Sequence, residues 1–197
     1  MEKKHTNTNE WDTVIESQHS LFDINFKELW HYRDLLVLFV KRDFVTVYKQ
    51  TILGPLWFFI QPLLTTITFT VIFGNVAQLS TDGAPKVIFY MAGITLWNYF
   101  SNCLTSVSGV FNANAGIFGK VYFPRLIMPL TIVVSNLMKF GVQFLLFISF
   151  VVYFTFNHQI SPNSWILLTP FIILLMALIA MGIGLILSSM TTKYKDL

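Results

Sequence analysis

Three long stretches without a charged side chain constrain this chain more than any other feature. Residues 50–81, 87–119 and 140–192 contain no Asp, Glu, Lys or Arg. Because a helix needs about 20 apolar residues to cross a bilayer, each stretch has room for one or two such helices. Only 12% of all residues are charged, which is about half the fraction found in soluble domains. The sequence therefore predicts an all-α integral membrane protein.

The uncharged stretches divide into four expected membrane spans, separated by short polar or Gly- and Pro-containing segments. We place these spans at about 53–75, 87–108, 127–156 and 165–187. Pro62 falls inside the first span, where it removes a backbone hydrogen bond and favours a kink. In the fourth span, Ala180, Gly184 and Ser188 repeat at every fourth residue. Such a row of small residues predicts close packing against another helix.

The distribution of Lys and Arg predicts which side of the membrane each loop faces. Most of these cations precede the first span: Lys3, Lys4, Lys27, Arg33, Lys41, Arg42 and Lys49. Others lie between the second and third spans and in the tail: Lys120, Arg125, Lys193 and Lys195. Since cytoplasmic loops are enriched in Lys and Arg, both termini and the segment at 112–129 are expected in the cytoplasm of a multi-pass protein.

The chain before the first span has two parts. Residues 1–26 are polar with charges of both signs, and we expect a loosely ordered cytoplasmic segment there. Over residues 27–48, apolar side chains recur at helical spacing: Leu29, Tyr32, Leu35, Leu36, Phe39 and Val40. This pattern predicts an amphipathic helix. With Trp30 at one end, it favours a helix lying flat on the membrane surface; the alternative is a helix packed on a soluble partner.

The segment at 112–129 is more than a turn. It holds a short apolar run, Ile117 to Phe123, between Gly116 and Pro124. A simple connection would need only Gly, Pro and polar residues. We interpret the segment as a small docking element held between two membrane helices.

The sequence offers no evident catalytic or metal site. The run from Gly116 to Val121 has the wrong spacing for a phosphate-binding loop, and Val121 stands where Ser or Thr would bind magnesium. The four histidines are scattered along the chain. We therefore expect a transport subunit, not an enzyme, that binds no cofactor itself and depends on a partner for energy.

Three blocks of sequence resemble the permease subunit of bacterial type-2 ABC exporters for polysaccharides, the O-antigen, capsule and teichoic-acid group. The blocks are residues 42–57 with Gln61 and Pro62, residues 120–125 with Pro129, and residues 188–196. Their order and spacing around the expected spans make the match specific. The resemblance covers about residues 27–197.

The resemblance implies an exporter built from two permease chains and two ATPase chains, in the bacterial cytoplasmic (inner) membrane. ATP and magnesium would bind to the partner ATPase. A coupling helix would sit in a groove of that ATPase, at Ala113, Asn114, Ala115, Gly116, Ile117, Phe118, Gly119, Lys120, Val121 and Tyr122.

The resemblance also implies a pathway for lipid-linked glycan between the two permeases, lined partly by aromatic rings. Aromatic faces offer apolar contact to sugars without a fixed hydrogen-bond register. The candidates are Trp57, Phe58, Trp97, Tyr99 and Lys139. Aromatic belts that face lipid are the alternative for the rings. A lysine inside a span must snorkel, pair or face a wet cavity, so a role of Lys139 in the pathway stays one of several possibilities.

One departure from the resembled family concerns length. Such permeases normally have six spans, whereas four are expected here, so we expect the transmembrane domain to be incomplete at the C-terminus. Two other functions stay open. A secondary transporter would show intramembrane charges and internal repeats. A membrane-embedded glycan or acyl transferase would show a cluster of acids, histidines or metal ligands near one membrane face.

Overall fold

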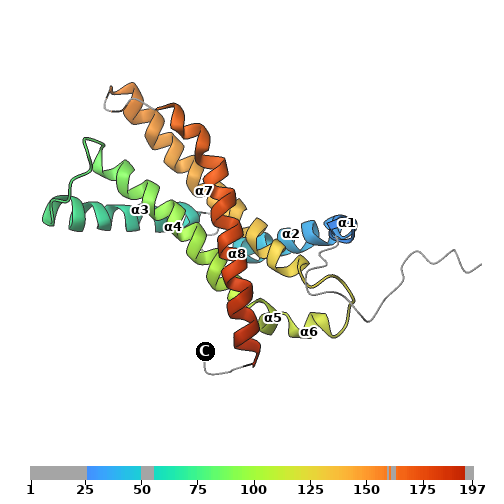
Figure 1. Ribbon diagram of the computed structural model, residues 1–197. Coiled ribbons are helices and arrows are strands. Elements are labelled where there is room, and N and C mark those ends of the chain that lie inside the picture. Colours follow the sequence, from blue (N-terminus) through green and yellow to red (C-terminus); the bar gives the residue numbers. More distant parts are fainter. Residues whose placement is uncertain (1–25, 50–55, 159, 161–162, 194–197) are drawn as a thin grey trace, which may run out of the picture.

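The computed structural model describes residues 26–49, 56–158, 160 and 163–193, and this part of the chain is helical throughout, joined by short connections (Figure 1). The first helices are α1 (Phe26–His31), α2 (Arg33–Lys49), α3 (Trp57–Phe69), the π-helix η2 (Thr70–Val76) and α4 (Lys86–Ser108). They are followed by α5 (Val110–Ala113), α6 (Ala115–Phe118), α7 (Ile127–Phe156), the 3-10 helix η3 (Ser164–Leu168) and α8 (Thr169–Lys193). The prediction for residues 1–25 lies outside the described residues.

Helix length and hydropathy confirm that this is an all-α membrane protein. Within the described residues, three helical segments are long and apolar enough to cross a membrane: Trp57–Val76, Ile127–Phe156 and Ile166–Thr191. They coincide with the first, third and fourth expected spans. Helix α4 coincides with the second. Its 23 residues give about 34 Å at 1.5 Å per residue, which is enough to cross, but polar side chains such as Asn98 and Asn102 make it less apolar.

The closest helix packing joins α4 to α8. Ala180, Gly184 and Ser188 of α8 are all buried. A Cβ atom added to Gly184 would lie 2.8 Å from Cβ of Val107 and 3.3 Å from the carbonyl oxygen of Leu104. The row of small residues therefore lets the two backbones approach, as its spacing predicted.

Helix α7 completes this central group. Tyr99 and Cys103 of α4, Phe140 of α7 and Ala180 of α8 form one buried cluster. The rings of Tyr99 and Phe140 have centroids 5.1 Å apart. Aromatic and small side chains thus hold α4, α7 and α8 together near the middle of the molecule.

Helix α3 is attached differently. In both figures it runs across the direction of α8 instead of alongside it. Only Pro62 and Thr66 of α3 are buried, and the helix continues through Pro62 without a break. Large apolar side chains such as Leu64 and Ile67 are more than half exposed. Helix α3 therefore does not run parallel to α8 in one bundle. Little of its surface is covered by other helices of the described chain.

The amphipathic segment forms α1 and α2, with a turn at Tyr32. Its predicted apolar stripe packs on the chain itself: Leu29, Tyr32, Leu35, Leu36 and Phe39 contact a cluster that includes Phe123, Ile127 and Met128. A second face of the segment exposes Trp30, Val37 and Leu38, each at least 60% exposed. The predicted stripe thus packs against the rest of the chain. The second face is apolar and exposed, so it is the face that could contact a membrane surface.

Candidate functional site

The segment between α4 and α7 folds as two single helical turns, α5 and α6, followed by an extended return to α7. Asn114 separates the turns, and its Nδ2 donates to the carbonyl oxygen of Val110 at 2.9 Å. After α6, the backbone N–H groups of Lys120 and Val121 donate to the carbonyl oxygen of Ile117 at 3.0 and 3.2 Å. These bonds close a compact tip, which we call the insert tip and define as residues 115–122.

Two residues of the insert tip point inward and anchor it. Ile117 and Phe118 are half-buried and pack against the cluster that contains Phe39, Val110 and Phe123. The ring centroid of Phe118 lies 5.4 Å from that of Phe123. The tip is therefore fixed to α2 and to the start of α7.

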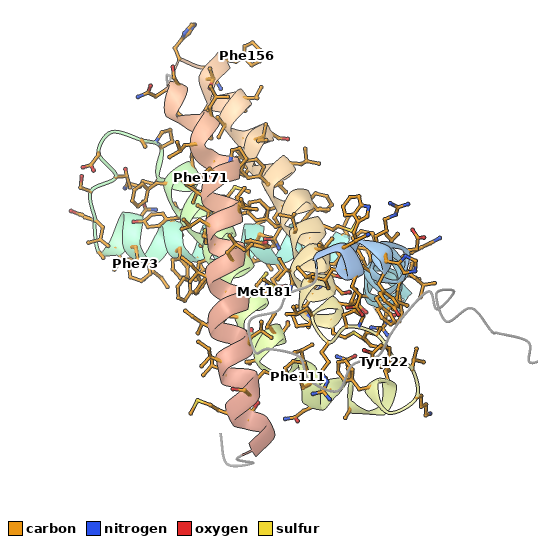
Figure 2. All side chains as sticks on the ribbon, turned by 45° about the vertical axis from the view of Figure 1, so that its right-hand side comes forward. Phe73, Phe111, Tyr122, Phe156, Phe171 and Met181 are labelled. Carbon is orange, nitrogen blue, oxygen red and sulfur yellow. The ribbon has the colours of Figure 1, made fainter. Side chains whose placement is uncertain are left out.

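The outer side of the insert tip is free. Val121 and Tyr122 are 54% and 64% exposed, and Gly116, Gly119 and Lys120 are exposed as well. Figure 2 shows Tyr122 at the edge of the molecule, beside the ribbon of the insert. The ten residues predicted to couple to an ATPase, Ala113 to Tyr122, thus comprise an anchored pair and an exposed rim. The helix within them is one turn long.

An aromatic groove of about 470 Å³ lies between α3, η2 and α4. Its wall is largely apolar and includes the following residues: Thr65, Phe69, Phe73, Phe89, Tyr90, Gly93, Ile94, Trp97 and Asn98. The rings of Phe69 and Phe73 have centroids 5.2 Å apart, and those of Phe73 and Tyr90 lie 6.4 Å apart. In Figure 2, Phe73 and Tyr122 lie on opposite sides of α8. The groove and the insert tip are therefore separate surfaces.

The structure distributes the five predicted pathway residues over different places. Trp97 lines the aromatic groove and is 65% exposed. Trp57 and Phe58 open α3, with Trp57 45% exposed and Phe58 half-buried. Tyr99 is only 3% exposed, inside the cluster between α4, α7 and α8. In this structure Tyr99 therefore packs inside the protein, and the pathway hypothesis rests on the other four predicted residues.

Lys139 lies in a second pocket, of about 340 Å³, between α2, α4 and α7. All but one of its lining residues have polar side chains, namely Arg42, Asp43, Thr46, Ser106, Ser135, Asn136 and Lys139; the exception is Ile132. Lys139 Nζ donates to Asn136 Oδ1 over a long 3.4 Å. The lysine therefore faces a polar cavity, one of the three surroundings expected for a cation in a span.

Sequence reasoning missed several members of both pockets. Phe69 and Phe73 are spaced by one helical turn, and Tyr90 and Trp97 by about two turns; this spacing is a usable signal for an aromatic face. Arg42 and Lys139 are far apart in sequence, and no local pattern indicates that they share a pocket. Within the described residues, no three His, Cys, Asp or Glu side chains lie close enough to hold a metal ion.

Residues 34–197 match the ABC-2 type transporter family. The chain is 32% identical to an O-antigen export system permease protein RfbA of Klebsiella pneumoniae, over 83% of this chain and 61% of that protein. It is 25% identical to an O-antigen export system permease protein RfbA of Myxococcus xanthus, over 87% of this chain and 64% of that protein.

These matches differ in how much of the compared protein or family they cover. The chain spans less than two thirds of the length of these relatives. The family match, by contrast, covers the region from the start of α2 to the end of the chain, including the insert and both pockets. The chain belongs to the ABC-2 type transporter family.

Proposed function

We propose that this chain is the permease subunit of an ATP-driven exporter for a lipid-linked polysaccharide, an O-antigen or a similar cell-surface glycan. The observation that carries the proposal is the similarity, over more than four fifths of the chain, to proteins named O-antigen export permeases. The exporter would act in the bacterial cytoplasmic membrane, with the N-terminus in the cytoplasm. The chain would be a transport subunit, not an enzyme, and would work as a homodimer.

A separate ATPase, which binds ATP and magnesium, would dock on the insert tip. Support comes from how the tip is built. Half-buried Ile117 and Phe118 fix it to α2 and α7, while exposed Val121 and Tyr122 offer apolar and aromatic surface outward. Aromatic side chains such as tyrosine are enriched in protein interfaces relative to the rest of the protein surface.

The aromatic groove between α3 and α4 would be part of the glycan pathway, together with Trp57, Phe58 and Trp97. Its rings leave a largely apolar surface with few polar groups. Such a surface can contact the C–H faces of many sugars without holding one of them tightly. That property suits a polymer that must slide.

The docking proposal is tested by co-purification with the cognate ATPase. The double variant Val121→Asp/Tyr122→Asp places charge on the exposed rim and leaves the anchoring pair intact. We expect loss of the ATPase from the purified complex. The matched control is Leu79→Asp, which charges a 54% exposed leucine in the loop before α4. Undiminished co-purification of a folded rim variant would contradict the proposal.

A further inference from the structure

The polar pocket between α2, α4 and α7 contains hydrogen-bond donors that the described residues leave unused. Ser135 is 4% exposed, and its Oγ has no hydrogen-bond partner in the described chain. Ser135 lines the pocket, and a buried hydroxyl without a partner is unfavourable, so an acceptor bound in the pocket would satisfy it. Asn136, 6% exposed, lies beside it on α7.

The pocket also carries positive charge. Its ionisable side chains are Arg42, Asp43 and Lys139. Nε and Nη2 of Arg42 donate to Asp43 Oδ1 at 3.0 and 2.8 Å, which leaves other guanidinium N–H groups available. Lys139 has three donors, and the long contact to Asn136 uses one of them. With two cationic side chains against one carboxylate, the pocket has a formal net charge of +1.

The depth of the pocket in the membrane follows from the length of α7. Its 30 residues extend about 45 Å, at 1.5 Å per residue, and the hydrocarbon core is about 30 Å thick. On the proposed function, the start of α7 is cytoplasmic. If the roughly 15 Å by which α7 exceeds the hydrocarbon core lies on the cytoplasmic side, Lys139, about 18 Å from that start, lies about 3 Å inside the boundary between the headgroups and the hydrocarbon.

We propose that this pocket binds the phosphate group of a lipid in the inner leaflet. Phosphate oxygens would accept hydrogen bonds from Lys139 Nζ, Ser135 Oγ and the guanidinium of Arg42. Charge-assisted hydrogen bonds of this kind are the strong ones, and the phosphate supplies the acceptor that Ser135 lacks. The inference rests on the proposed function only for the orientation of α7 in the membrane.

The test measures the Kd of three probes for the purified chain in detergent micelles. Farnesyl diphosphate carries a lipid chain and phosphate, farnesol carries the chain alone, and inorganic pyrophosphate carries the phosphate alone. We expect farnesyl diphosphate to bind at least about tenfold more tightly than either of the others. Equal binding of farnesol would overturn the phosphate role. Equal binding of pyrophosphate would overturn the proposed role of the lipid chain and would indicate a site for free anions.

Variants assign the binding to this pocket. Lys139→Gln should weaken binding of farnesyl diphosphate about tenfold to a hundredfold, as expected for a lost charged hydrogen bond, whereas Lys139→Arg keeps the charge and should restore most of it. The matched control is Lys41→Gln, which removes an exposed cation from the same helix as Arg42. If Lys139→Gln does not fold, Ser135→Ala decides, with an expected loss of severalfold. Unchanged affinity in the folded variants would overturn the proposal. These binding assays need no export, so they can fail independently of the exporter function.

Discussion

Gly184 occupies the closest approach between two helices, and it is the position where one added methyl group should matter most. The added Cβ of Gly184→Ala would meet Val107 at 2.8 Å, so α4 and α8 must separate or Val107 must move. Overpacking of this kind costs about 1–3 kcal/mol. We expect a lower Tm in detergent, measured by thermal unfolding.

Gly182 provides the control for this prediction. It lies two residues earlier on α8, and a Cβ there would meet nothing within 4 Å. Gly182→Ala should keep or raise the Tm, because alanine is the better helix former. Equal destabilisation by both substitutions would contradict close packing against Val107 as the cause of the effect at Gly184.

Trp97 tests the aromatic groove at the scale of one side chain. Trp97→Ala removes a ring that is 65% exposed on the groove wall. On the proposed function, it should reduce the glycan that reaches the cell surface at unchanged protein level, and Trp97→Phe should retain most export because an aromatic face persists. Surface glycan is measured by immunoblot in cells that depend on this permease. Normal export by Trp97→Ala would exclude the residue from the pathway.

At the scale of elements, Phe123 joins α2 to the insert tip, which lies more than 60 residues later in the sequence. Its ring centroid lies 6.0 Å from that of Phe39 on α2 and 5.4 Å from that of Phe118 in the insert tip. Phe123→Ala should destabilise this junction by about 3–5 kcal/mol and make α1 and α2 sensitive to protease. Tyr122→Ala, at a neighbouring exposed position, should change stability by less than about 0.5 kcal/mol. Equal protease resistance of both variants would contradict the role of Phe123 in holding α2 to the insert tip.

The elements themselves were largely predictable from the sequence, because charge-free runs and Gly or Pro breaks set their limits. The expected spans at 87–108 and 127–156 agree with α4 and α7 to within about one residue. The direction faced by α2 was not predictable. Its apolar stripe is the same whether it meets lipid or protein, and only the arrangement of Phe123 and Ile127 decides between them.

The candidate site was predictable only in part, for the same reason. The insert was identified because charge and Gly/Pro punctuation are local properties of the sequence. That Arg42 and Lys139 line the same pocket is a long-range property, because it depends on how α2 packs against α7. Tyr99 shows the converse case: an aromatic residue looks alike in sequence whether it lines a path or fills the core between α4 and α7.

At the scale of the whole molecule, the arrangement across the membrane can be tested with introduced cysteines. Cys103 is buried, so Cys103→Ser provides a background without exposed thiols. On this background, Ala115→Cys in the insert should react with a membrane-impermeant maleimide only in inverted membrane vesicles. Gln78→Cys, in the loop before α4, should react in intact spheroplasts. Labelling of both positions from one side would overturn the proposed orientation.

The cluster around Phe123 has a mechanical consequence. Since it packs the insert tip and α2 against the first turn of α7, a displacement of the tip that keeps this cluster intact would carry the first turn of α7 with it. A rotation of about 10° at the base of a helix about 45 Å long moves its far end by roughly 8 Å. If α7 turns as a rigid helix, a motion at the insert tip would thus be felt on the opposite side of the membrane.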